Sequence, residues 1–322
     1  YKRQAQADHR KTGRERLMAR FGSRSTAEQV SQGIDLSGKN ALVTGANTGI
    51  GKETARVLAL RGAHVTMACR DQQKAEHARK DILRAADGRI EDAQLDLLDL
   101  DLNSLDATRE SAAEFARRKQ PLHLLINNAG IMIPMERRTE DGFEAHFGVN
   151  HLAHFLFTNL LLDTLIAAGR SRVVMVSSSA MGMATLTPAL EDLNWEKRRF
   201  SGFRSYGDSK LMNLMFAREL DRRYGDRGIV SSALHPGVIA TELARDQSLP
   251  FMLLGVFMMP FMKTVDQGAA TTVLVATSPD YESLGGLYFS NCRAKRPDHK
   301  LALDDTACRN LWKRSAELTG LE

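Results

Sequence analysis

The sequence has few cysteines and no long apolar run. Its 322 residues include three cysteines, an odd number with no CxxC pair: Cys69, Cys292 and Cys308. This pattern argues against a disulfide scaffold and against a zinc site, so we expect no metal and a reducing compartment. No stretch of about 20 apolar residues is present that could span a bilayer. We expect an intracellular protein, cytoplasmic or on the cytoplasmic side of a membrane, with an anchor upstream of Tyr1 left open.

Acidic charge does not dominate, and the small basic excess is confined to one end. The formal net charge is +5, and residues 1–24 carry eight Lys and Arg against Asp8 and Glu15, a local net of +6. The remainder is therefore close to neutral, and we do not expect nucleic acid as a partner. We interpret residues 1–37 as a basic flexible arm with at most one short helix. Contact of this arm with an anionic membrane surface is a weaker hypothesis.

From residue 38 onward, short apolar runs alternate with segments of helical period. Strands are predicted at 40–44, 64–68, 93–97, 122–127, 172–177, 229–234 and 287–289. Helices are predicted at 52–60, 72–86, 104–118, 151–167, 206–224, 266–277 and 304–318. Repeated β-α units with apolar strands predict a parallel sheet with helices on both faces. We expect a doubly wound Rossmann-type α/β fold, formed as a single domain over residues 38–322.

A glycine-rich turn follows the first predicted strand. It reads Thr44-Gly-Ala-Asn-Thr-Gly-Ile-Gly51, with the spacing G-x-x-x-G-x-G. Glycines allow the backbone to approach a pyrophosphate, and the next helix offers free N–H groups and a positive dipole end. The predicted cofactor contacts are Gly45, Asn47, Thr48, Gly49, Ile50 and Gly51. The alternative is a tight strand–helix connection that binds nothing.

The end of the second predicted strand bears on the choice of cofactor. An acid there favours NAD, and a basic group accommodates the 2′-phosphate of NADP. Arg70 favours NADP, whereas Asp71 lies 20 residues after Gly51, near the offset of an NAD-type acid. Because Cys69 occupies the strand tip, we predict NADP and leave NAD open. The alternative is that both charges are solvated loop residues.

A tyrosine and a lysine four residues apart form the candidate catalytic pair. Tyr206 and Lys210 share one face of a predicted helix. A free phenol has a pKa of about 10, and a neighbouring ammonium lowers the pKa toward that of a useful acid/base. Ser178 follows a predicted strand, where its hydroxyl can bind a substrate oxygen. The alternatives are a chance pair on an exposed helix and an ordinary serine-rich loop.

Taken in order, these motifs resemble the short-chain dehydrogenase/reductase family over roughly residues 38–320. The motifs that carry the resemblance are Thr44–Gly51, Asn127–Gly130, Asn150, Ser178, Tyr206 with Lys210, and His235–Gly237. Within the family, segments 141–155, 267–272 and 285–289 resemble the retinol dehydrogenase-like branch, which includes the oxidoreductase part of WW-domain-containing oxidoreductases. No WW domain is visible, because both tryptophans, Trp195 and Trp312, lie inside the enzyme region.

The resemblance implies a role for each matched residue. Tyr206 exchanges the proton with the substrate oxygen, Lys210 lowers the tyrosine pKa and binds the nicotinamide ribose, and Ser178 polarises the carbonyl. Asn150 holds a water in a proton relay to Lys210; read on its own, it is an N-cap of the next helix. The remaining implied cofactor contacts are Asn128, Ala129 and Gly130 along the cofactor, Asp96 and Leu97 at the adenine, and Pro236, Gly237, Val238 and Thr241 at the carboxamide.

An almost wholly apolar segment indicates the substrate class. Residues 249–262 include four methionines and three phenylalanines, within a segment, about 243–265, that the resemblance makes a substrate flap. We predict a lipophilic alcohol or its aldehyde or ketone, retinoid- or steroid-like, as the small-molecule partner. A core or homodimer-interface helix and shallow membrane insertion are the alternatives. The competing function is a signalling or scaffold protein that binds cofactor but mainly recruits partners; the intact set of four catalytic residues favours an enzyme.

Overall fold

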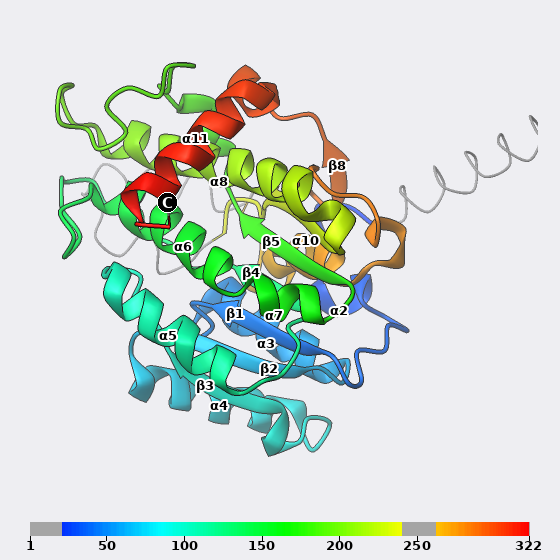
Figure 1. The fold of residues 1–322 in the computed structure, drawn as a ribbon. Coiled ribbons are helices and arrows are strands. Elements are labelled where there is room, and N and C mark those ends of the chain that lie inside the picture. The colour runs from blue at the N-terminus through cyan, green and yellow to red at the C-terminus, as the bar shows by residue number, and fades with distance from the viewer. Residues whose placement is uncertain (1–20, 240–261, 322) are drawn as a thin grey trace, which may run out of the picture.

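An eight-stranded sheet forms the centre of the computed structural model, which describes residues 21–239 and 262–321 (Figure 1). The strand order is β3-β2-β1-β4-β5-β6-β7-β8. The strands are β1 Asn40–Thr44, β2 His64–Cys69, β3 Leu95–Asp99, β4 Leu124–Asn127, β5 Ser171–Val176, β6 Ile229–His235, β7 Tyr288–Ser290 and β8 Arg293–Lys295. Strands β1 to β7 run parallel, and β8 pairs antiparallel with β7. The doubly wound α/β fold is therefore confirmed, with an antiparallel strand added at one edge.

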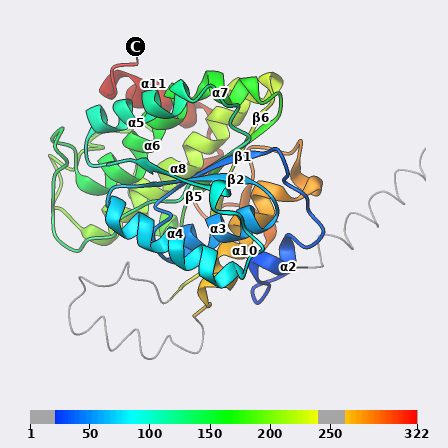
Figure 2. The same ribbon diagram turned by 90° about the horizontal axis from the view of Figure 1, so that it is seen from below.

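Helices cover both faces of the sheet, as Figure 2 shows. One layer contains α2 Ala27–Val30, α3 Gly49–Leu60, α4 Gln72–Ala86 and α10 Val265–Thr277. The other contains α5 Leu105–Arg117, α6 Ala153–Leu160, α7 Leu162–Ala167, α8 Gly202–Tyr224 and α11 Asp305–Leu318. Neighbouring strand residues supply different layers, since Leu42 belongs to the second core and Val43 to the first. Strands β1, β2, β4 and β5 are largely apolar and almost wholly buried, because helices cover both of their faces.

Shorter helical turns join these elements. They are the 3-10 turns η1 Asp92–Gln94, η3 Ser179–Met183, η4 Gly225–Arg227, η7 Pro279–Tyr281 and η8 Lys300–Leu303, and the π-helix η2 His146–Leu152. The predicted single helix 151–167 is thus three pieces, η2, α6 and α7. The predicted strand 93–97 begins two residues later, because Gln94 lies in η1 and donates its side-chain amide to the Ala59 carbonyl.

An aromatic cluster holds α11 against α8 and α6. The ring of Trp312 lies 5.0 Å from Phe155 and 5.6 Å from Phe216, measured between centroids. All three side chains are buried. Burial of aromatic rings of this size contributes much of the apolar stabilisation of a layer. The cluster therefore fixes α8, the helix that carries Tyr206 and Lys210.

The expected flexible arm is wrong for the part that the structure describes. Residues 27–30 form α2, with a capping box between Thr26 and Gln29. Ala27 and Val30 are buried against α3 and α10, and Arg61 donates to the Glu28 carbonyl at 2.8 Å. The fold thus begins before residue 38, whereas residues 1–20 lie outside the described residues.

Two further expectations concern membranes and cysteines. Across residues 21–239 and 262–321, no helix is long and apolar enough to cross a bilayer. Most of the expected flap, residues 243–261, lies outside the described residues. The three cysteines are buried and free.

Replacing Val30 with alanine tests whether α2 belongs to the fold. Val30→Ala should lower the free energy of unfolding by roughly 1–2 kcal/mol, because it removes two buried carbon atoms. Exposed Gln32→Ala is the control and should change that free energy by less than about 0.5 kcal/mol. Urea denaturation followed by circular dichroism measures both. Equal stability of the two variants would contradict the packing of α2.

Candidate active site

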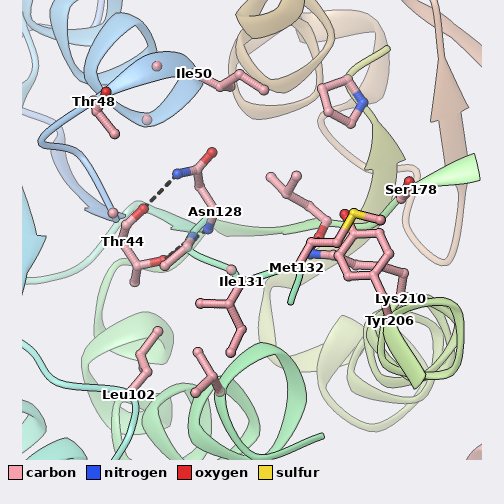
Figure 3. A pocket seen from close by; sticks show the side chains of 18 of the residues that line it. Thr44, Thr48, Ile50, Leu102, Asn128, Ile131, Met132, Ser178, Tyr206 and Lys210 are labelled. Atoms are coloured by element: carbon pink, nitrogen blue, oxygen red, sulfur yellow. Dashed lines mark hydrogen bonds between the residues drawn. The ribbon is translucent and has the colours of Figure 1, made fainter. Parts of the chain in front are cut away.

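A single large cavity lies at the carboxyl ends of β1, β4, β5 and β6 in the described part of the chain. Its volume is about 1100 Å³. It extends from the glycine-rich turn to Ser178, Tyr206 and Lys210, and Figure 3 shows Thr48 of the turn and these three residues on opposite sides of Asn128. Ligands of open parallel sheets bind in this position.

The glycine-rich turn forms one end of the cavity and leaves the first turn of α3 open to an anion. Thr48 is the N-cap of α3, but its side chain makes no capping hydrogen bond. A Cβ at Gly51 would lie 2.3 Å from the Gly45 carbonyl oxygen, so the turn closes only without a side chain there. Free N–H groups at a helix N-terminus and a backbone without side chains suit a pyrophosphate. The predicted turn residues 45 and 47–51 all line the cavity.

Thr44 joins this turn to the middle of the cavity. Its hydroxyl oxygen accepts the backbone N–H groups of Asn128 and Ala129, each at 2.9 Å, and lies 3.0 Å from Nε2 of His154. The Asn128 amide in turn donates to the Thr44 carbonyl at 2.8 Å (Figure 3). Burial lowers the pKa of His154 to about 4, so the ring is neutral. The structure therefore adds Thr44 and His154 as residues that shape the site.

At the tip of β2, the structure separates the two competing charges. The Asp71 carboxylate caps α4 by accepting the Lys74 N–H at 3.0 Å, and it also pairs with the Lys74 ammonium. Arg70 is exposed, lines the cavity, and forms no ion pair with any residue that the structure describes. Cys69 is buried beneath the turn, where its sulfur accepts N–H groups of Ala46 and Asn47, and burial raises its pKa to about 11. The acid is thus engaged locally, and the arginine is available to a ligand.

The predicted adenine contacts are wrong in position. Asp96 lies in the middle of β3, paired in register with Thr66, and its carboxylate lies 3.3 Å from Arg118 and 3.4 Å from His64. Neither Asp96 nor Leu97 lines the cavity, whereas residues 100–103 do. The reason is the later start of β3, which moves the strand tip to Asp99.

The side chains of Tyr206, Lys210 and Ser178 converge at the other end of the cavity (Figure 3). Tyr206 and Lys210 lie on one face of α8, and the Lys210 ammonium is 5.5 Å from the centre of the tyrosine ring. It donates to the Val176 carbonyl at 3.1 Å. Ser178 follows β5, caps η3 by accepting the Ala180 N–H at 3.1 Å, and hydrogen-bonds the Tyr206 phenol. One substrate oxygen can therefore reach both hydroxyls.

Burial shifts both members of the pair toward their neutral forms. It raises the pKa of Tyr206 to about 12, and the hydrogen bond from Ser178 offsets only part of the rise. It lowers the pKa of Lys210 to about 8. The expected lowering of the tyrosine pKa is therefore wrong for the protein without ligands, because loss of hydration disfavours the phenolate.

Asn150 lies in the π-helix η2, not at a helix start, so the N-cap interpretation is wrong. It is fully buried; its amide donates to the Ile131 carbonyl and to Ser209 Oγ, each at 3.0 Å, and its oxygen accepts the Ile131 N–H at 2.8 Å. A Cβ at Gly130 would lie 3.1 Å from the Asn150 oxygen and 3.2 Å from the Lys210 nitrogen. Glycine at 130 thus allows the asparagine and the lysine to approach the same point.

The loop after β6 completes the cavity wall. Pro236, Gly237 and Val238 line it, as predicted for carboxamide contacts. Lys263 holds this loop, donating its ammonium to the Pro236 carbonyl at 3.2 Å and its N–H to the Val238 carbonyl at 2.9 Å. Thr241 lies outside the described residues.

Comparison with known proteins agrees with this geometry. Residues 39–188 match the family model described as short chain dehydrogenase. The chain is 44% identical to retinol dehydrogenase 12 of Mus musculus, covering 90% of this chain and 89% of that protein. It is 40% identical to the WW domain-containing oxidoreductase of Danio rerio, covering 93% and 73% of the two chains.

Solved structures share the fold. A crystal structure of an uncharacterized protein from Mycobacterium paratuberculosis has a TM-score of 0.70 and 35% identity, covering 90% of this chain and 97% of that one. A short chain dehydrogenase from Burkholderia cenocepacia in complex with NADP has a TM-score of 0.61 and 26% identity, covering 79% and 96%.

Adding a methyl group at Gly51 tests the phosphate turn. Gly51→Ala should weaken NADPH binding at least about tenfold, since the new Cβ meets the Gly45 carbonyl and displaces the free N–H groups from the anion. Gly225→Ala, where a Cβ meets nothing within 4 Å, is the matched control and should bind normally. Fluorescence titration of NADPH measures both. Unchanged affinity in Gly51→Ala would place the pyrophosphate elsewhere.

Proposed function

Because the chain belongs to the short-chain dehydrogenase family, we propose that it is an NADP(H)-dependent oxidoreductase that interconverts a lipophilic alcohol and its aldehyde or ketone. The observation that carries the proposal is one cavity with an anion-binding turn at one end and Ser178, Tyr206 and Lys210 at the other. A nicotinamide dinucleotide is long enough to join two such ends. The proposed domain spans residues 38–322, with its packed N-terminal edge extended to α2.

In the proposed mechanism, the protein supplies a proton and a hydrogen-bond donor to the substrate oxygen. A nicotinamide cofactor, when bound, would supply or accept the hydride. The Tyr206 hydroxyl is protonated at neutral pH because burial raises its pKa to about 12, and this is the form that carbonyl reduction requires. It gives its proton to the substrate oxygen in reduction and takes it back in oxidation. The Ser178 hydroxyl donates to the same oxygen and stabilises the charge that develops on it.

Lys210 and Asn150 act behind the tyrosine. With a pKa of about 8, the Lys210 ammonium can give a proton, at a modest cost in free energy, to the phenolate that remains after Tyr206 has protonated the substrate. Asn150 and Lys210 border the space over Gly130, where a water between them would complete a relay. Lys210 lines the cavity and would also bind the nicotinamide ribose, as the family resemblance implies.

The preference for NADP rests on Arg70. Its guanidinium lines the cavity without a charged partner among the described residues, whereas Asp71 is engaged as a helix cap. A guanidinium binds a phosphate through several charge-assisted hydrogen bonds. The related short chain dehydrogenase in complex with NADP supports the same choice.

The preference for a lipophilic substrate rests on the side chains around the catalytic end. The cavity there is lined by apolar residues: Met132, Ile133, Val149, Met183, Phe203, Val238 and Met262. Met183, Phe203 and Val238 are 49%, 38% and 46% exposed, so apolar side chains reach the surface at the cavity, beside the exposed Arg137 and Arg138. Ile239 pairs with Lys263, so the described residues on either side of most of the proposed flap, 243–265, lie next to each other. The name of the related retinol dehydrogenase 12 supports a retinoid-like molecule.

Removing the phenol oxygen tests the proposed acid. Tyr206→Phe should lower the turnover of all-trans-retinal with NADPH by roughly 10²–10⁴-fold while NADPH still binds, since only proton transfer is lost. Tyr224→Phe, at the far end of the same helix, should keep full activity. Normal turnover by Tyr206→Phe would refute the role of this tyrosine. Cofactor binding without turnover of any lipophilic carbonyl by the unaltered protein would favour the scaffold hypothesis.

Truncating the arginine tests the cofactor preference. Arg70→Ala should weaken NADPH binding about tenfold, the loss of one charge-assisted contact, and leave NADH binding unchanged. Arg84→Ala on α4, where the arginine pairs with Asp81, is the control and should affect neither. Separate fluorescence titrations with NADPH and NADH give the two constants. Equal affinity of the unaltered protein for both cofactors would overturn the preference.

A further inference from the structure

A buried carboxylate and imidazole lie at the start of the π-helix η2. Glu144 and His146 are both fully buried, and Glu144 Oε1 lies 2.9 Å from His146 Nδ1. The carboxylate also accepts the N–H groups of His146 at 3.1 Å and Phe147 at 3.0 Å. Burial acts to raise the pKa of Glu144, but the hydrogen bonds from His146 and Ser205 outweigh it and lower the pKa. The carboxylate is therefore ionised and forms a fixed support.

Both nitrogens of His146 are engaged. Nε2 accepts the N–H of Ile133 at 2.9 Å, so this nitrogen carries a lone pair and the proton is on Nδ1. Nδ1 faces Glu144 and also lies 3.0 Å from the hydroxyl of Ser205. A neutral ring held at both ends cannot rotate without breaking hydrogen bonds in a buried site.

His146 and Asn150 make parallel connections. Asn150 joins Ile131 to Ser209 of α8, and four residues earlier His146 joins Ile133 to Ser205 of the same helix. The π-helix brings both side chains to the same side, between the 131–133 segment and α8. Irregular helical turns of this kind occur often at functional sites.

The two serines on α8 immediately precede the proposed catalytic residues. Ser205 precedes Tyr206, and Ser209 precedes Lys210 and donates its hydroxyl to the Tyr206 carbonyl at 2.7 Å. The His146 ring also packs edge-on against the Tyr206 ring, with centroids 5.9 Å apart and planes at 72°. Ile131, Met132 and Ile133 form the facing wall of the cavity. His146 thus contacts the tyrosine ring on one side and the substrate wall on the other.

We propose that His146, held by Glu144, is a positioning residue that fixes the Tyr206 ring relative to the 131–133 wall. The inference rests on the proposed function of Tyr206. A proton donor must meet its acceptor within a few tenths of an ångström, and a displacement of about 1 Å can cost roughly 10²-fold in rate. Loss of the imidazole would leave the tyrosine in place on α8 but free to tilt.

The test compares two equally buried histidines. His146→Phe keeps an aromatic ring but removes the polar contacts of both ring nitrogens with Ile133, Glu144 and Ser205. His151→Phe is the control: His151 is fully buried in the same π-helix, but its Nε2 lies 2.9 Å from Ser315 of α11 and contacts neither Tyr206 nor the cavity wall. The measurements are kcat and KM for all-trans-retinal with NADPH, the NADPH dissociation constant, and the urea midpoint.

We expect His146→Phe to lower kcat at least about tenfold with an NADPH dissociation constant within about twofold of the unaltered protein. His151→Phe should lose stability but keep kcat. His146→Gln, whose side-chain oxygen can accept the Ile133 N–H, should recover part of the lost kcat. If His146→Phe does not fold, Ser205→Ala should lower kcat about threefold at unchanged NADPH affinity.

Two results would overturn the inference alone. One is the same kcat in His146→Phe and His151→Phe. Where His146→Phe does not fold, the corresponding result is an unchanged kcat in Ser205→Ala. The other is a loss confined to NADPH affinity, which would make His146 a general structural residue. Absence of retinal turnover by the unaltered protein, across other lipophilic carbonyls as well, would instead overturn the proposed function and this inference with it.

Discussion

The site depends on one hydroxyl oxygen, that of Thr44, which joins the tips of two neighbouring strands. It accepts two backbone N–H groups from the segment after β4 and meets the His154 ring. His154 in turn contacts the Asn150 carbonyl through Nδ1 at 3.2 Å. The glycine-rich turn and the proposed catalytic end are therefore parts of one hydrogen-bonded assembly. Such buried polar assemblies are strong only when every member has a partner.

Desolvation is the second constraint on the site. The same burial that excludes water from the cavity raises the pKa of Tyr206 and lowers that of Lys210. Burial disfavours the charged form of each group, but with these pKa values the phenol is neutral and Lys210 remains mostly an ammonium at neutral pH. The charges and hydroxyl groups of bound ligands would enter the same enclosed space. They would therefore have to stabilise any ionised intermediate.

The sequence was informative where a short pattern determines both structure and chemistry. Tyr206 and Lys210 share a face because they are four residues apart on a helix, and Ser178 reaches the cavity because parallel strands end at one edge. Short sequence patterns did not predict the features that depend on tertiary contacts. Strand β3 begins two residues later than expected, after Gln94 in η1, so residues 100–103 line the cavity and Asp96 and Leu97 do not. The capping box at Thr26 and Gln29 was a visible signal for α2. His146 gave no signal, because a π-helix has no period that a short sequence reveals.

The pairing of Ile239 with Lys263 has a consequence for divergence among relatives. A segment whose two ends are joined at the rim of a site can change in length and composition without altering the register of the strands beneath it. Each doubling of such a segment costs only about 0.6 kcal/mol in closure entropy. The length of the chain between these two residues can therefore change among relatives while the strands that carry the proposed catalytic residues keep their register.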